Sequence, residues 1–437
     1  MSVELTAKKS AIPGQHGPFR GWYILAVTVL TQALTIGCTN YIYSLFMIPI
    51  GAEFGASRMS MGSGMALFLL AMGVYSPLLG RWVDRGNKRN IMVLGGLLMA
   101  VGFALLSRAV ALWQMALVLV LFIASGSSMM GALASSTIIA NWFERYRGRA
   151  LGISLMGTSL GGVVMPVITA RLIEHIGWRG SLLAIAVGIA SIALLVVRPV
   201  IVNAPRDIGQ HPDGVEPEGD APLAEKSGKK TSVPDAFRLL DLLRDANFWR
   251  ITACTSLVMF AGVLLSVHFI PYAAELGIDS ASASFVLALF AITGVAGKIF
   301  FGYLTDLFHV GRVFCAVAFL DAASWGLLLS DTSYAVFLVG VGLMGFGVGG
   351  AAPVMNAAIA KCFGPRVFGR VMGFIGVLLL ALIAIPGPLG GFIHDRTGSY
   401  HLIFQLTFWV FPLAGLIAWF IRLPRDAQSA GKPVFHH

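Results

Sequence analysis

The chain consists of long runs of apolar residues separated by short polar breaks. Each run has about 20 residues or more, enough to cross about 30 Å of hydrocarbon at about 1.5 Å per helical residue. We therefore predict twelve membrane-spanning helices in an all-α fold. The predicted spans are 21–49, 60–80, 90–107, 112–140, 149–173, 180–200, 249–272, 283–305, 312–330, 332–361, 369–393 and 400–421.

The longest polar stretch, 201–248, separates the first six runs from the last six and is rich in Pro, Gly and charge, which predicts a linker. Near its end, Ser232 is a predicted helix cap with Asp235 three residues later. Apolar residues then recur at helical spacing, which predicts a short amphipathic helix on the membrane surface. These residues are Phe237, Leu240, Leu243 and Phe248. The predicted organisation is a tail 1–20, an N-terminal half 21–200, the linker 201–248, a C-terminal half 249–422 and a tail 423–437.

The composition agrees with a bilayer environment. The 437 residues are 57% hydrophobic and 12% charged, with a mean hydropathy of +0.81. A water-soluble chain of this length could not bury so much apolar surface. The net charge of +10 is therefore not a nucleic-acid signal. The cysteines lie in apolar runs without paired spacing and are predicted to be small buried hydrophobes. They are Cys38, Cys254, Cys315 and Cys362.

The distribution of basic residues predicts the orientation. Of 31 Lys and Arg residues, all but six fall in the two tails, the linker and the loops on the same side. The exceptions are Lys298, within a run, and Arg58, Arg108, Arg171, Arg179 and Arg396, on the opposite side. Basic loops face the cytoplasm. We therefore expect both termini and the linker to be cytoplasmic, in the cell inner membrane.

The two halves also repeat one another. Several residues recur at an offset of 221 or 222 positions, which predicts two homologous six-helix halves of the kind found in secondary transporters. The matched pairs are Gly80 with Gly302, Asp84 with Asp306, Gly148 with Gly369, Arg149 with Arg370 and Gly177 with Gly398.

The loop between the second and third spans resembles the signature loop of the major facilitator superfamily. Its residues here include Gly80, Asp84, Arg85 and Arg89, and the second copy retains Gly302, Asp306 and Arg312. The resemblance implies that these residues act in conformational gating.

Within that superfamily the chain resembles the monocarboxylate and oxalate/formate transporters over nearly its whole length. Three stretches carry this resemblance: 143–152 leading to Gly157, 20–22 at the first span, and His268 to Tyr272 in the seventh. In that family an Arg of the eighth helix, four residues before the Gly of the second signature loop, binds the substrate. The equivalent residue here is Lys298. Animal members also have an Asp four residues earlier, where this chain has Gly294.

Lys298 also stands out without the resemblance. An ionisable group deep in a span costs about 2.5–3.5 kcal/mol on insertion scales, so it is a functional candidate by default. The residue shares a face with small residues, including Gly294 and Gly302, and lies about 12 Å from the cytoplasmic end. We predict that Lys298 binds a carboxylate.

Asp321, in the ninth span, is the other intramembrane charge, at a similar depth of about 13.5 Å. Two hypotheses follow. Asp321 could form a structural ion pair with Lys298, or it could be a proton switch that holds Lys298 when ionised and releases it when protonated. His268 is a second candidate for proton coupling because its unperturbed pKa lies near physiological pH. It could equally be a hydrogen-bonded histidine at the interface.

Other residues could line a substrate cavity or could instead join helices to one another. The polar ones are Asn40, Tyr41, Tyr43, Ser127, Ser128 and Asn356. Phe346 and Phe374 could contact an apolar substrate body or could simply pack.

No nucleotide-binding loop, metal-ligand cluster or nucleophile–base arrangement appears in the sequence, so we predict no enzyme activity and no cofactor. Energy must then come from gradients. The predicted function is proton-coupled symport of a small monocarboxylate by alternating access, carried out by a monomer. Anion exchange of the oxalate/formate type is the alternative within transport. A non-transporting membrane sensor is the alternative from another class.

Overall fold

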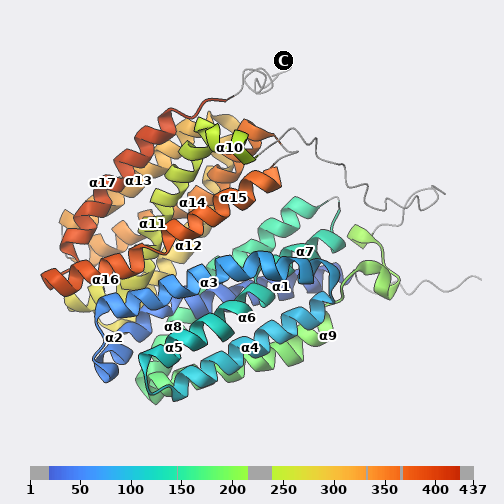
Figure 1. Ribbon diagram of the computed structural model, residues 1–437, viewed down its shortest axis with the longest axis horizontal. Helices are drawn as coiled ribbons and strands as arrows, with labels where there is room; N and C mark the ends of the chain where they lie inside the picture. The colour runs from blue at the N-terminus through green and yellow to red at the C-terminus, as the bar shows by residue number, and fades with distance from the viewer. Residues whose placement is uncertain (1–18, 145, 215–238, 331–332, 365–367, 424–437) are drawn as a thin grey trace, which may run out of the picture.

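The structure is a computed structural model that describes residues 19–144, 146–214, 239–330, 333–364 and 368–423. Every regular element in these ranges is a helix. The helices fall into two bundles, one N-terminal and one C-terminal (Figure 1).

The N-terminal half contains α-helices interrupted by short π-helical segments. In chain order its elements are α1 (Gly21–Ile36), η1 (Gly37–Tyr41), α2 (Tyr43–Phe54), α3 (Arg58–Arg85), α4 (Lys88–Arg108), α5 (Leu112–Val118), η2 (Leu119–Ala124), α6 (Ser125–Met130), α7 (Ala132–Trp142), α8 (Arg147–Ile192), η3 (Ala193–Val197) and α9 (Arg198–Val200).

The described part of the linker is short, and the C-terminal half has longer unbroken helices. The remaining elements are η4 (Pro205–Ile208), η5 (Pro212–Gly214), α10 (Leu239–Arg244), α11 (Ala246–Glu275), α12 (Ser280–Leu307), α13 (Val310–Ser330), α14 (Tyr334–Phe363), α15 (Phe368–Ile383), α16 (Pro386–Thr397) and α17 (His401–Trp419).

These helices provide the twelve predicted crossings. Ten stretches of the described chain are long and apolar enough to span a bilayer. One of them, Arg149–Val200, contains two crossings because Gly177 breaks it with a φ of 70°. The 28-residue α3 adds the remaining crossing. The predicted all-α, twelve-helix fold is therefore confirmed.

Left-handed glycines end helices at equivalent places in the two halves. Gly177 follows the fifth crossing and Gly398, with a φ of 72°, ends α16. Gly55 ends α2 with a φ of 60°, and Gly277 follows α11 with a φ of 74°. Glycine adopts this conformation without steric cost. The matching positions agree with the internal repeat in the sequence.

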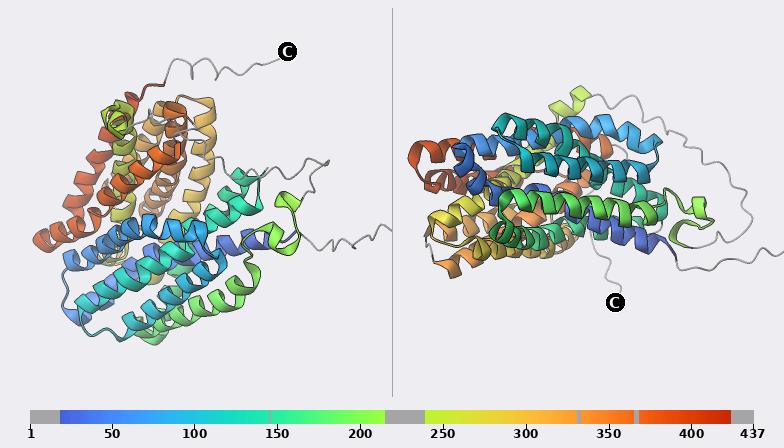
Figure 2. Two further views of the ribbon diagram at one scale, coloured as in Figure 1. Left: turned by 45° about the vertical axis from the view of Figure 1, so that its right-hand side comes forward. Right: turned by 90° about the horizontal axis from the view of Figure 1, so that it is seen from below.

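The two bundles meet along several pairs of helices. Helix α3 packs against α15 and α16, α2 against α11, and α8 against α12. At the end of the molecule that carries α2, α3 and α16 the bundles lie close together, and at the opposite end they splay apart (Figures 1 and 2). The positive-inside prediction makes the close end the outer one, and we call it the predicted outer end.

The predicted surface helix of the linker is only partly visible. Its proposed cap Ser232, together with Asp235 and Phe237, lies outside the described residues, and α10 begins at Leu239. Phe248 is buried but belongs to α11, and Leu243 is exposed. Leu242 of α10 is buried. The side chain of Leu240 lies outside the described part, so the predicted apolar face of this helix stays a prediction.

Each of the two signature loops forms a short connection between consecutive helices, α3 to α4 and α12 to α13. Helix α3 runs through Gly80, Asp84 and Arg85, whose side chains lie outside the described part. The side chain of Asn87 caps α4 by accepting the main-chain N–H of Asn90 at 3.2 Å. The main-chain N–H of Arg89 donates to Asn203 at 3.2 Å, which ties this loop to the start of the linker. In the second copy, Gly302 is partly buried in α12, while Asp306 and Arg312 are exposed.

Candidate functional site

Lys298 joins the two halves of the molecule. It is partly buried in α12, and its ammonium nitrogen Nζ donates to two hydroxyl oxygens of α8. The distances are 2.8 Å to Ser159 Oγ and 3.3 Å to Thr158 Oγ1. Ser159 is itself buried, with 2% of its surface exposed. Within the described residues, no ion pair involves Lys298. The cation therefore has neutral partners only.

Small residues allow the helices around Lys298 to approach closely. A Cβ atom added at Gly297 would overlap the carbonyl oxygen of Phe346 in α14. One added at Gly162 of α8 would lie 2.7 Å from the Cβ of Ala291 in α12. Close backbone approach of this kind is typical of helix packing in membranes. It fixes the position of α12 between α8 and α14, and with it the direction of Lys298.

Asp321 lies away from Lys298. Its side chain in α13 is fully buried, and neither carboxylate oxygen has a hydrogen-bond partner among the described residues. The carboxylate faces α14, because a Cβ added at Gly347 would overlap Oδ1. Lys298 points towards α8 instead. The contact predicted between Lys298 and Asp321 is therefore not formed in this structure. The role of Asp321 stays a prediction.

His268 is a fully buried residue whose two ring nitrogens are both hydrogen-bonded. Nε2 lies 2.8 Å from the carbonyl oxygen of Gly387, and Nδ1 lies 3.1 Å from the hydroxyl of Tyr400. A carbonyl can only accept, so Nε2 carries the proton and Nδ1 accepts from Tyr400. This geometry favours the structural alternative for His268 over the proton-coupling one.

Of the polar residues predicted for the first crossing, Tyr41 is closest to the contact between the halves. A Cβ added at Gly162 would lie 2.5 Å from Cζ of its ring. Asn40 is partly exposed and donates to the neighbouring Thr39 at 3.1 Å. Tyr43 points elsewhere, because its hydroxyl donates to the carbonyl oxygen of Met61 inside the N-terminal half. Tyr43 is therefore separate from the Lys298 region.

The two serines predicted in the fourth crossing are buried within their own half. Ser127 donates to Sδ of Met99 at 3.7 Å, and Ser128 donates to the carbonyl oxygen of Ala124 at 2.8 Å. The contact of Ser127 with α4 matches the alternative in which it joins helices, whereas Ser128 bonds within its own crossing. Neither contacts Lys298.

Of the predicted cavity residues in the C-terminal half, one is packed against other side chains and two are exposed. Phe346 packs on Phe300 and Phe301 of α12, with ring centroids 5.4 Å and 5.3 Å apart. Phe374 and Asn356 are both exposed. Asn356 shares its exposed face of α14 with two alanines one turn away on either side, Ala352 and Ala360.

Two features of the site were missed by the sequence analysis. The first is the Thr158 and Ser159 pair, because hydroxyl residues in a helix usually bond to their own backbone. The second is Asp395 of α16, whose carboxylate caps α3 of the other half. Its Oδ1 accepts the main-chain N–H of Arg58 at 3.0 Å, and its Oδ2 accepts that of Met59 at 2.9 Å. This interhalf cap joins the two halves at the predicted outer end.

A second aspartate caps a helix near the same end but within one half. Asp279 accepts the main-chain N–H groups of Ala281 and Ser282 at 2.9 Å and 3.0 Å. The hydroxyl of Ser282 also donates to it at 2.6 Å, and this bond is the main reason that the pKa of Asp279 is lowered. Asp279 is therefore ionised at neutral pH and provides a matched reference for Asp395.

Comparison with known proteins places the fold. The model of the Major Facilitator Superfamily matches residues 29–274 and 253–436. The chain is 23% identical over 430 residues to monocarboxylate transporter 12 of Mus musculus, covering 94% of this chain and 87% of that protein. It is 26% identical over 435 residues to monocarboxylate transporter 11 of Homo sapiens, covering 94% and 84%.

A solved structure has the same architecture. It is an inward-facing, unoccupied bacterial homologue of the human lysosomal transporter Spinster, with a TM-score of 0.71 and 16% identity. The match covers 92% of this chain and 97% of that one. The named relatives are transporters rather than enzymes. The chain belongs to the Major Facilitator Superfamily of membrane transporters.

Proposed function

We propose that this protein is a secondary active transporter of a small organic anion, working as a proton-coupled monocarboxylate symporter by alternating access. The observation that carries the proposal is the position of Lys298. Its ammonium group reaches from α12 to two hydroxyls of α8 and has no carboxylate partner in the described structure. A membrane-embedded cation with only neutral partners favours binding of an anion.

A substrate carboxylate would compete with Ser159 for the ammonium group. The carboxylate carries a charge opposite to that of the ammonium group, whereas the hydroxyl of Ser159 is neutral, so the carboxylate would displace the hydroxyl. One ammonium balances one carboxylate, which favours a monoanion. Because Lys298 contacts residues of both halves, the occupancy of this position would affect how the halves move against each other.

Asp321 is our candidate for the coupled proton. A buried carboxylate without hydrogen-bond partners is costly when ionised, which favours its neutral form in the present conformation. This agrees with the half of the cycle in which protonated Asp321 leaves Lys298 free for substrate. In the return step, we propose that ionised Asp321 pairs with Lys298, and that this requires a change in the packing of α12, α13 and α14.

The alternative within transport is anion exchange, and the lack of a Lys298–Asp321 contact favours it. Symport and exchange give different uptake results in proteoliposomes. A symporter in proteoliposomes accumulates labelled anion in response to a pH gradient without internal substrate. An exchanger accumulates label only when the vesicles are preloaded with anion.

The experiment that tests the proposal is a thermal-shift screen of carboxylic acids on the purified protein. A ligand that binds only the folded state at about 100 times its Kd stabilises that state by about 2.7 kcal/mol. We expect at least one monocarboxylate to raise Tm in the wild type and to leave Tm unchanged in Lys298→Met. A panel of monocarboxylates that never raises Tm, while amines or neutral solutes do, would contradict the proposal.

A further inference from the structure

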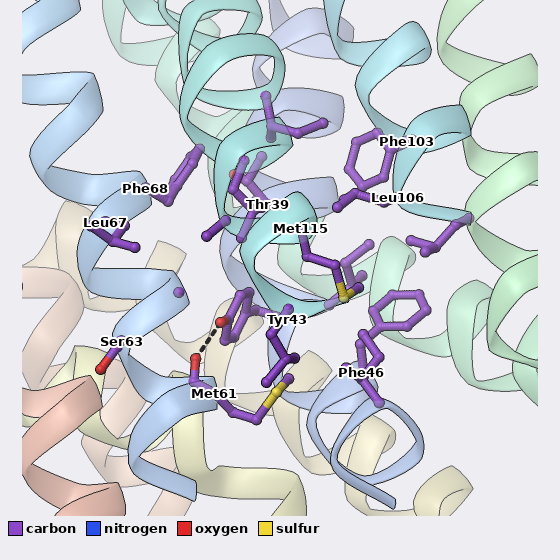
Figure 3. Close-up of a pocket in the computed structure, with 18 of the residues that line it drawn as sticks. Thr39, Tyr43, Phe46, Met61, Ser63, Leu67, Phe68, Phe103, Leu106 and Met115 are labelled. Carbon is purple, nitrogen blue, oxygen red and sulfur yellow. Dashed lines mark hydrogen bonds between the residues drawn. The ribbon is translucent and has the colours of Figure 1, made fainter. Parts of the chain in front are cut away.

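The N-terminal half encloses a cavity that is separate from the Lys298 region. Its volume is about 390 Å³, within the usual size range of ligand pockets. All of its described lining residues lie between Cys38 and Leu182, so it lies within one half and not between the halves. Figure 3 shows side chains of α2, α3, α4 and α5 converging on it.

The cavity wall is largely apolar, and three of its hydroxyl groups are already hydrogen-bonded to main-chain carbonyl oxygens. Tyr43 donates to the carbonyl oxygen of Met61 across the cavity (Figure 3). Thr39 donates to the carbonyl oxygen of Thr35 at 2.7 Å, and Ser63 to that of Met59 at 2.8 Å. No charged side chain is among the described lining residues. A ligand for this cavity is therefore apolar, unlike the anion proposed for Lys298.

The mouth of the cavity lies between α3 and α5, which lie side by side on one face of the molecule (Figure 1). Leu67 of α3 and Trp113 of α5 both line the cavity and are exposed. Each belongs to a stripe of large exposed apolar side chains. The stripes are Leu67, Leu70, Val74 and Leu78 on α3, and Trp113, Leu117 and Leu121 on α5 and η2. Exposed apolar stripes on membrane-spanning helices face lipid, so the cavity opens sideways into the bilayer.

Two π-helical segments form part of the wall. Cys38 and Thr39 belong to η1, and Leu119 and Ile123 belong to η2. A π-helical turn is wider than an α-helical one, is uncommon, and occurs most often at functional sites. In this half, π segments in the first and fourth crossings face the same cavity. An empty apolar space of this size loses packing contacts on every side, so an occupant would stabilise the fold.

We propose that this cavity binds an acyl chain of a membrane lipid, which enters between Leu67 and Trp113. The lipid is the occupant because the mouth opens to the hydrocarbon of the bilayer and the described lining residues include no charged side chain to hold a soluble ion. This inference does not depend on the proposed transport function. The chain would lie against η1 and η2 and fill the space between the first, second and fourth crossings.

The test uses the full-length protein in nanodiscs of phosphatidylcholine, a fraction of which carries a photoactivatable diazirine in the middle of one acyl chain. After irradiation, peptide mapping locates the cross-linked residues. We expect cross-links to concentrate on the cavity-facing residues of 60–68 and 112–123. Ala116→Phe, which fills the cavity from α5, should remove most of them. Ser63→Phe fills it from α3 and should have the same effect.

The matched control is Ala335→Phe, an exposed position at the start of α14 that lies outside the cavity. It should leave the cross-links unchanged. Cross-links spread evenly over all exposed apolar positions in the wild type would overturn the inference. Cavity cross-links that persist in both filling variants would do the same. If one filling variant does not fold, the other variant and the wild-type map still decide the outcome.

Discussion

The ammonium group of Lys298 lies 2.8 Å from the hydroxyl oxygen of Ser159, and this bond joins the C-terminal half of the transporter to the N-terminal half. A second bond, to Thr158 at 3.3 Å, runs to the same helix. The cation at the proposed substrate position is therefore also part of the contact between the moving halves. Under the proposed function, an anion bound at Lys298 would influence the conformational change directly.

Replacing Lys298 should remove anion binding without unfolding the protein. A hydrogen bond to a charged group contributes about 1.5–3 kcal/mol, so Lys298→Met should weaken anion affinity about 10- to 100-fold. Methionine is apolar and fits a membrane interior, so the Tm of the free protein should not fall. Lys298→Arg keeps the charge and should retain binding. The measurement is the Kd of a monocarboxylate by calorimetry, and equal affinities in the wild type and Lys298→Met would refute the assignment.

Ser159→Ala should increase affinity for the anion. In the free protein Lys298 would lose its shortest hydrogen bond, and the substrate would then displace one partner fewer. A difference of about 1 kcal/mol corresponds to roughly a fivefold lower Kd. Calorimetric titration of Ser159→Ala checks this. A higher Kd would mean that Ser159 binds the anion itself and does not compete with it.

The interhalf cap predicts that Asp395→Ala opens the predicted outer end. A side-chain cap on a helix N-terminus contributes about 0.5–2 kcal/mol, and here its loss affects the contact of α3 with α16. We expect the distance between spin labels at Arg108 and Ala335, one in each half, to shift towards longer values.

Asp279→Ala is the matched control for that experiment. It removes a cap of the same kind from α12, but this cap lies within the C-terminal half. It should leave the distance distribution unchanged. An equal shift in both variants would indicate general loosening of the fold. It would contradict the proposed role of the interhalf cap of Asp395.

His268 should act as a structural residue. Its ring is buried between Gly387 and Tyr400, and an unpaired partner left behind costs about 1–3 kcal/mol. His268→Phe should therefore lower Tm, and it should leave the pH dependence of uptake per folded molecule unchanged. Uptake profiles between acidic and neutral pH provide the check. Loss of the pH dependence in a stably folded variant would restore His268 as the proton acceptor.

The sequence predicted the parts of this structure that depend on counting along a helix. The number of crossings follows from run length, and Gly177 and Gly398 mark equivalent helix ends. Directions around a helix were harder to predict. Asp321 was predicted at nearly the same depth as Lys298, but the packing of α12 between α8 and α14 directs the two side chains to different neighbours.

Tyr43 illustrates a second limit. The π-helical segment η1 lies just before it, and its extra residue per turn rotates the helix face that follows. A regular 3.6-residue repeat therefore does not predict the direction in which Tyr43 points. Contacts between the halves, such as that of Asp395 with the start of α3, join residues more than 300 positions apart. No local pattern in the sequence indicates them.

The central claim, that a proton and an anion move together through this site, is tested most directly by Asp321→Asn. The measurement is the uptake of labelled monocarboxylate into proteoliposomes with an acidic exterior and no internal substrate, alongside exchange in preloaded vesicles. We predict that the wild type accumulates label in the first assay, and that Asp321→Asn does not, although it still exchanges in the second. Accumulation by Asp321→Asn equal to that of the wild type would contradict the account.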